Sequence, residues 1–186
     1  TVATQSLNIF GDHSDVYACR QTGFAMLCET NPQEVMDLSP VAHLATIEGK
    51  VPFINFFDGF RTSHEIQKIE KWDYADLKEM CNMDAVAAFR AHALNPEHPA
   101  MRGSHENGDV FFQHREACNT AYNELPAIVE KYMAKVNEKL GTNYDLFNYY
   151  GAEDAERVIV AMGSVNDVAE EVIDYLTAKG EKVGLV

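Results

Sequence analysis

The stretch TGFAMLCETNPQEVMDLSPVAHLATIEGKVPFINFF, residues 22–57, carries the clearest indication of the fold. Its first six and last seven residues, TGFAML and VPFINFF, are almost continuously apolar, which is typical of strands covered on both faces. Between them, Asn31, Pro32 and Glu34 supply the cap, the first-turn proline and the acidic third position of a helix start. Strand, helix and strand in this order predict a βαβ unit in a parallel sheet, and therefore an α/β fold.

The helix of this unit is expected over residues 33–48, with Gly49 placed just after its end. Its core-facing residues recur at helical spacing: Val35, Leu38, Val41, Ala42 and Ala45. Pro40 is the exception, because a proline removes a backbone hydrogen bond from the middle of a helix. In a parallel sheet the functional loops follow the carboxyl ends of the strands, which here means the residues just after Phe57.

Working outward, residues 64–94 have a helical pattern that is strongest in DYADLKEM and DAVAAFRAHAL. Residues 95–109 form a polar loop that carries two prolines and two glycines. The clearest amphipathic helix is expected over 126–140, where apolar residues recur at intervals of four and Gly141 gives the stop.

A second βαβ pattern opens after residue 148. RVIVAM is expected to be a buried strand, Gly163 a turn, and Asn166 or Asp167 the cap of a helix, before KVGLV begins another strand. One such unit of about 30 residues cannot enclose a core of its own. We therefore expect a domain boundary near residue 148, and a chain that is a piece of a larger α/β protein.

Charge and cysteine content limit the class of protein. A formal net charge of −14 without any run of Lys or Arg disfavours nucleic acid and membrane surfaces as partners. The cysteines and histidines lack metal-ligand spacing, so no metal site is expected and the thiols indicate a cytoplasmic protein. A catalytic thiol is conceivable at Cys28, but a small buried cysteine is the favoured interpretation.

The segment GDHSD, residues 11–15, is a candidate site loop, because polar side chains interrupt apolar surroundings there. A carboxylate of Asp12 or Asp15 would fix the tautomer of His13 and raise its basicity, which suits proton transfer. The alternative is a capped turn, in which Asp12 or Ser14 accepts backbone N–H groups ahead of a helix. The sequence leaves both interpretations open.

The segment DGFRTSHE, residues 58–65, is the second candidate loop. Arg61 can bind a carboxylate through two parallel hydrogen bonds. Thr62 or Ser63 can cap a helix that begins near His64, and such a start favours an anion.

The same segment has a purely structural interpretation, in which Arg61 forms an ion pair with Asp58 or Glu65. Ser63, His64 and Glu65 do not qualify as a catalytic triad, since consecutive side chains diverge and triads are assembled from distant positions.

Both loops lie in long motifs that resemble pyruvate:ferredoxin (flavodoxin) oxidoreductase. These motifs are IFGDHSDVYACRQTGFAML and VPFINFFDGFRTSHEIQKIE. ALNPEHPAMRG and GAEDAERVIVAMGS are similar to the same family and keep the same order, so the resemblance covers essentially the whole chain.

The resemblance implies a large multidomain homodimer that converts pyruvate to acetyl-CoA and carbon dioxide and passes electrons to ferredoxin or flavodoxin. It implies thiamine diphosphate with Mg2+, 4Fe-4S iron–sulfur clusters and coenzyme A in the full enzyme, none of them bound by this segment alone. It also implies that residues 1–148 are the later part of the pyrimidine-type first domain of thiamine enzymes. Residues 149–186 would then be the start of a transketolase C-terminal-like second domain.

By the same resemblance, the family's cofactor-activating glutamate, its substrate-binding threonine and its pyruvate-binding arginine lie before Thr1, so no catalytic residue is assigned here. The expected neighbours of the substrate pocket are Asp12, His13 and Asp15. The expected residues of a domain interface, a subunit interface or an anion site are Arg61, Thr62, His64 and Glu65.

Two functional hypotheses follow. In the first, the chain is part of this oxidoreductase and is inactive alone. In the second, it is a stand-alone binding or assembly module that keeps the fold without catalysis. The two hypotheses differ in one expectation: a stand-alone module would be soluble and unfold cooperatively. We expect instead that a chain ending at Val186 exposes an unpaired apolar edge on the strand after Lys182, which is a template for aggregation.

Overall fold

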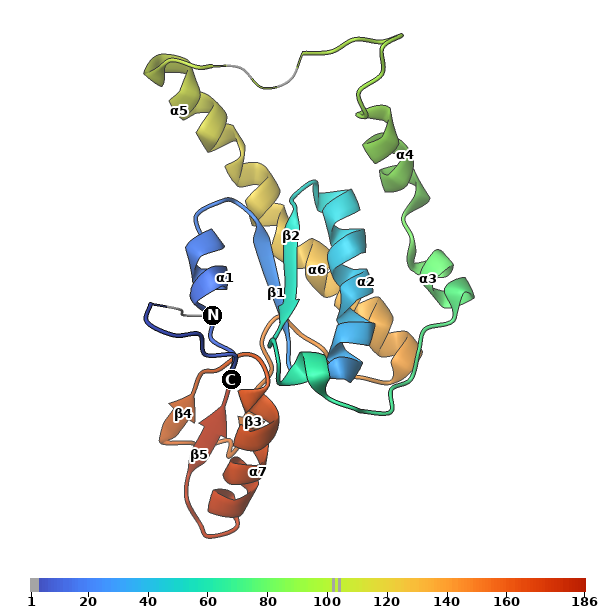
Figure 1. Cartoon of the computed structure of the whole chain (residues 1–186). Helices are drawn as coiled ribbons and strands as arrows, with labels where there is room; N and C mark the ends of the chain where they lie inside the picture. Colours follow the sequence, from blue (N-terminus) through green and yellow to red (C-terminus); the bar gives the residue numbers. More distant parts are fainter. Residues whose placement is uncertain (1–3, 102, 104) are drawn as a thin grey trace.

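The computed structural model describes residues 4–101, 103 and 105–186 (Figure 1). The strands are β1 (Ala25–Glu29), β2 (Phe53–Phe57), β3 (Tyr150–Gly151), β4 (Arg157–Ile159) and β5 (Val183–Leu185). The α-helices are α1 (Ser14–Cys19), α2 (Pro32–Gly49), α3 (Tyr74–Met80), α4 (Met83–Ala91), α5 (Gly108–Ala117), α6 (Asn119–Leu140) and α7 (Val165–Thr177). A short 3-10 helix, η1, spans Thr62–His64. The α/β class is confirmed.

The first βαβ unit is confirmed. β1 and β2 pair in parallel, with Ala25 opposite Phe53 and Glu29 opposite Phe57. β1 begins three residues later and β2 two residues later than the apolar runs suggest, and just before β2 the Pro52 carbonyl oxygen already accepts the Ala25 N–H at 2.9 Å. α2 packs against both strands, and α6 runs diagonally past α2 (Figure 1). The carboxyl ends of both strands therefore meet at one edge of the sheet.

The main core lies between α2 and α6. Val41 and Ala45 are fully buried on α2, while Tyr132 and Val136 are buried on α6, as the helical spacing predicts. Glu48, at the end of α2, accepts hydrogen bonds from the Tyr132 hydroxyl at 2.6 Å and from the Lys131 ammonium. These contacts stabilise the crossing of the two helices.

The predicted helix ends are correct at one end of α2 and wrong at the other. The Asn31 side chain caps the start, since its Oδ1 accepts the backbone N–H groups of Gln33 and Glu34 at 3.1 Å. At the other end, Gly49 stays helical and Lys50 takes the left-handed conformation, with φ of 56°. A Cβ on Gly49 would lie 2.8 Å from Leu125 Cδ1, so this glycine serves the approach of α6.

Further along, the helical prediction for 64–94 is only partly correct. The two strongest segments form α3 and α4, but residues 65–73 are not helical. The amphipathic helix expected over 126–140 begins earlier, at Asn119, and accommodates Pro126 within α6. Gly141 ends it as predicted, with φ of 71°. Within the polar segment 95–109, residues 102 and 104 lie outside the described part of the chain, and α5 already begins at Gly108.

The second unit, in orange and red in Figure 1, contains β4, α7 and β5 as a parallel βαβ unit with β3 added in antiparallel orientation. The strand order is β3-β5-β4, so β5 is the central strand. The expectation of an unpaired edge after Lys182 is therefore wrong, because β5 pairs on both sides. The expected burial of RVIVAM is wrong too: Val158 and Ile159 are exposed, since β4 is an edge strand that, within the described residues, pairs only with β5.

Among the described residues, no helix is both long and apolar enough to cross a bilayer.

Candidate functional site

Three segments that are distant in sequence meet at the Asp58 carboxylate, directly after β2. Its Oδ2 accepts the backbone N–H of Ser164, at the start of α7, at 2.5 Å. Its Oδ1 lies 3.8 Å from Nε2 of His13, which belongs to the loop before α1. The two candidate loops thus share one place at the carboxyl edge of the sheet, and the second unit joins them there.

In the first loop, the capped-turn interpretation is confirmed. Asp12 Oδ1 accepts the backbone N–H of Ser14 at 2.9 Å, and Asp15 Oδ1 accepts that of Val16 at 2.8 Å, at the start of α1. The carboxylate that faces the His13 ring instead belongs to Asp58, and the ring also meets the edge of Phe56, with 6.1 Å between ring centroids. Sequence reasoning missed this pairing, because it joins residues 45 positions apart.

In the second loop, the expected helix near His64 reduces to the three residues of η1, without a side-chain cap. Thr62 is buried, and its hydroxyl donates to the carbonyl oxygen of Thr30 at 3.3 Å, which ties the loop to the end of β1. Phe60 holds a left-handed φ of 67° and donates its backbone N–H to Ser63 Oγ at 2.8 Å. The loop is therefore held by the Thr62 and Ser63 hydroxyls together with the left-handed turn at Phe60.

Ser63 and His64 do touch, contrary to expectation: Oγ and Nδ1 are 2.9 Å apart. The tight turn of η1 brings these consecutive side chains together, while Glu65 is exposed. Arg61 has its guanidinium 5.3 Å from the centre of the Phe10 ring, and within the described chain no ion pair joins it to Asp58 or Glu65. The ion-pair interpretation of Arg61 is therefore wrong.

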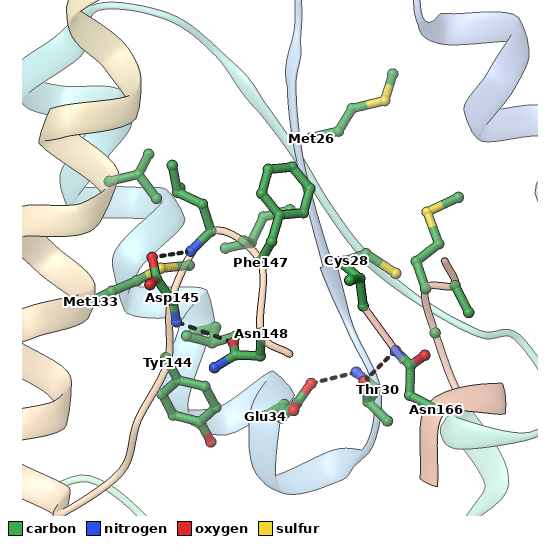
Figure 2. Close-up of a pocket in the computed structure, with 18 of the residues that line it drawn as sticks. Met26, Cys28, Thr30, Glu34, Met133, Tyr144, Asp145, Phe147, Asn148 and Asn166 are labelled. Atoms are coloured by element: carbon green, nitrogen blue, oxygen red, sulfur yellow. Dashed lines mark hydrogen bonds between the residues drawn. The ribbon is translucent and has the colours of Figure 1, made fainter. Parts of the chain in front are cut away.

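A cavity of about 1010 Å³ opens between β1, α6, residues 142–150 and the start of α7 (Figure 2). Met26, Met133 and Phe147 supply part of its apolar lining. On its polar side, Thr30 donates its backbone N–H to Glu34 Oε2 at 2.6 Å, and Asn166 Nδ2 donates to Thr30 Oγ1 at 3.3 Å. Burial raises the pKa of Glu34.

Asn166 or Asp167 was expected to cap α7, and that expectation is wrong. Ser164 occupies the cap position, while Asn166 and Asp167 reach back to the end of β1. Asn31 Nδ2 donates to Asp167 Oδ1 at 3.4 Å. The turn at Gly163 is confirmed, with φ of 83°.

Two ionisable groups, the buried Glu29 and the partly buried Cys28, lie at the end of β1. Glu29 is 0% exposed, and neither of its carboxylate oxygens has a hydrogen-bond partner among the described residues. Burial raises the pKa of Glu29 to about 8, so the group is largely a neutral acid at pH 7. Burial also raises the pKa of the neighbouring Cys28 thiol to about 12, which supports a structural cysteine over a catalytic one.

Comparison with known proteins assigns this chain to a family. Residues 1–134 match the family model described as pyruvate flavodoxin/ferredoxin oxidoreductase, thiamine diphosphate-binding. The chain belongs to that family. The resemblance read from the four sequence motifs is confirmed.

Relatives within the oxidoreductase family align along the full length of this chain. It is 60% identical over 185 residues to a pyruvate-flavodoxin oxidoreductase of Enterobacter agglomerans, and 57% identical to a pyruvate:ferredoxin oxidoreductase of Moorella thermoacetica. It is also 50% identical to a pyruvate dehydrogenase [NADP(+)] of Cryptosporidium parvum. Each alignment covers 100% of this chain, but it covers only 16% of the length of the first two relatives and 10% of the third.

The family description names thiamine diphosphate, a cofactor with a negatively charged diphosphate end. The rim of the large cavity carries four carboxylates, Glu34, Asp145, Asp167 and Glu170, against a single Arg20. Such a rim repels a diphosphate unless a cation intervenes. Among the described residues, no cluster of three or more His, Cys, Asp or Glu side chains could hold that cation. These residues therefore do not fit the diphosphate end of the cofactor.

Proposed function

We propose that this chain is a segment of an enzyme that oxidatively decarboxylates pyruvate with coenzyme A to acetyl-CoA and carbon dioxide, passing electrons to ferredoxin or flavodoxin. The observation that carries the proposal is the unbroken similarity of all 186 residues to relatives named for pyruvate, flavodoxin and ferredoxin. Because the chain spans 16% of those relatives, the segment frames the site and is inactive by itself.

The first domain is proposed to occupy residues 1–148 and to be completed by other parts of the same polypeptide. In the described chain β1 pairs only with β2, so the backbone groups along its other edge are unpaired. The large apolar cavity lies along β1 and is lined by Ala25, Met26, Leu27 and Cys28. A further strand of the polypeptide could pair with the free edge of β1, and a further strand or helix could fill the cavity.

Residues 149–186 are proposed to begin a transketolase C-terminal-like second domain. The parallel β4–α7–β5 unit supports this assignment. Its small core of Ile173, Val183 and Leu185 is too limited for a domain of its own.

The substrate pocket is proposed to lie near Asp12, His13 and Asp15, at the carboxyl edge of the sheet. Arg61 and His64, which are both exposed, are proposed to face a domain interface, a subunit interface or an anion, with Glu65 beside them. For Thr62 we propose a supporting role, because its hydroxyl is already bound to Thr30.

Thiamine diphosphate with Mg2+, the 4Fe-4S clusters and coenzyme A are proposed to be held by other parts of the polypeptide. The acidic rim of the cavity and the lack of a metal-ligand cluster in the described residues support that division. The full enzyme is proposed to be a cytoplasmic homodimer.

The test is to purify the native protein that contains this sequence and to measure its mass, its iron content and its pyruvate-dependent reduction of ferredoxin and flavodoxin. We expect a polypeptide several times larger than 20.8 kDa, with iron and with reduction that requires coenzyme A. The isolated 186-residue chain is the control and should be inactive. A native protein of about 21 kDa without iron would instead support the stand-alone module.

A further inference from the structure

We propose that Asp58 is a positioning residue, which holds the His13 loop and the first turn of α7 in one fixed arrangement. This inference rests on the proposed function in one respect only: the His13 loop is taken to line the substrate pocket. The structural part, that one carboxylate joins the two βαβ units, stands on the contacts of this chain alone.

The contact with α7 replaces a missing cap. Ser164 occupies the N-cap position of α7, but its side chain makes no capping hydrogen bond. Asp58 Oδ2 accepts the Ser164 N–H at 2.5 Å from outside the helix. A carboxylate at this end also interacts favourably with the partial positive charge of the helix N-terminus. Asp58 thus accepts the N–H of the N-cap residue of α7, as the N3 carboxylate of a capping box does within other helices.

Gly163 makes this contact possible. Its φ of 83° is left-handed, and a Cβ built on it would lie 2.8 Å from Asp58 Oδ2 and 3.0 Å from Oδ1. Any other residue would push the carboxylate away from the helix start. The glycine turn after β4 is therefore matched to Asp58, which gives the turn a role beyond reversing the chain.

The second oxygen faces the opposite loop. Oδ1 lies 3.8 Å from His13 Nε2, and the space beside it is bounded by Gly11, whose Cβ position would be 3.5 Å away. The side chain of Asp58 is only 12% exposed, so its two oxygens are committed to two separate partners. Displacing the Asp58 carboxylate should therefore loosen both the His13 loop and the start of α7.

Two further hydrogen bonds, Asn166 to Thr30 and Asn31 to Asp167, also link α7 to the first unit. They do not involve Asp58 or the His13 loop. Loss of the Asp58 carboxylate should therefore leave the units attached and change only how the helix start and the loop are held.

The experiment compares Asp58→Ala, Asp58→Asn and Gly163→Ala in the full-length enzyme, using hydrogen exchange followed by mass spectrometry and steady-state kinetics. Asp73→Ala is the matched control, because Asp73 Oδ1 caps α3 by accepting the Ala75 N–H at 2.9 Å. We expect Asp58→Ala and Gly163→Ala to speed exchange about tenfold at the start of α7 and in residues 8–20. The control should speed exchange only in α3.

Asp58→Asn keeps an acceptor for Ser164 and removes the charge beside His13. We expect it to leave the start of α7 close to the parent while loosening residues 8–20. If Asp58→Ala leaves either segment unchanged, or if its effect matches that of Asp73→Ala, the positioning role is wrong.

The kinetics separate this claim from the proposed function. We expect Asp58→Ala to raise KM for pyruvate about tenfold while kcat falls less, because a displaced pocket wall weakens binding first. Faster exchange in both segments with unchanged KM would uphold the positioning role and overturn the placement of the substrate pocket. Unchanged exchange with unchanged KM would overturn the positioning role.

Discussion

Replacing Glu29 with glutamine should remove a pH dependence that the buried carboxyl gives to the end of β1. The side chain is 0% exposed and both oxygens lack partners among the described residues. Burial raises the pKa of Glu29 from 4.5 to about 8 in the folded state. Below pH 4.5 the group is protonated in both the folded and the unfolded state, so it adds no pH dependence there.

Between pH 4.5 and 8 the unfolded chain releases this proton while the folded chain keeps it. The free energy of opening this region therefore falls by about 1.4 kcal/mol for each pH unit. From pH 5.5 to 7.5 the loss is about 2.5 kcal/mol, a roughly seventyfold rise in the opening constant, because the slope flattens as the pH nears 8. Glutamine cannot ionise, so Glu29→Gln should abolish the slope.

Hydrogen exchange of peptides covering residues 24–31 in the full-length enzyme measures this opening, once intrinsic exchange rates are corrected for pH. Glu65→Gln is the matched control, because Glu65 is exposed and its replacement should leave the slope unchanged. The prediction is wrong if the free energy of opening does not change with pH in the parent enzyme, or if it changes with the same slope in Glu29→Gln.

Three further predictions concern other parts of the chain. Partial burial alone would raise the pKa of Glu48, but hydrogen bonds, chiefly from Lys131, outweigh this effect and lower the pKa to about 2. The Glu48 carboxylate should therefore stabilise the α2–α6 crossing above pH 4.5 and lose this effect toward pH 2. Glu48→Gln should lower the free energy of opening of α6, measured by hydrogen exchange at pH 7, by about 1 kcal/mol, and it should weaken the loss of protection between pH 4.5 and 2. An unchanged loss of protection in this pH range would contradict the prediction. Iodoacetamide at pH 8 should modify the exposed Cys118 and leave Cys28 unmodified, since burial raises the pKa of Cys28 to about 12. Peptide mapping that finds Cys28 modified before Cys118 would contradict this prediction. Gly151→Ala should destabilise the β3–β5 pair by about 2 kcal/mol, because its φ is 120° and a Cβ would lie 2.6 Å from the Val183 carbonyl oxygen. Exchange should quicken in β5 but not in β1, and equal protection in β5 would argue against this clash.

Much of the first unit could be predicted because its signals are local. The Asn31 cap and the apolar stripe of α2 depend on residues within a few positions of one another, and both are confirmed. The helix end at Gly49 was mispredicted for a non-local reason. Leu125, from α6, occupies the space where a side chain would be, so the glycine serves packing and Lys50 ends the helix.

The second unit shows the same limit. Apolar runs predicted β4 and β5 correctly as strands, but burial and pairing depend on neighbours from elsewhere in the chain. β3 pairs with β5 and makes it central, while β4 remains an exposed edge. No pattern within KVGLV could indicate which side of the strand would be covered.

The sequence alone determined the α/β class, the first parallel strand pair, the two candidate loops and the family. These follow from residue spacing, turn chemistry and long motifs, all of which are readable along one chain. Three features emerge only in the folded chain: His13 faces Asp58, Asp58 accepts a hydrogen bond from the start of α7, and Glu29 is buried with no hydrogen-bond partner among the described residues. Those features arise where β1, β2 and α7 converge, and the cost of burying a charge or of leaving a helix start uncapped depends on that convergence.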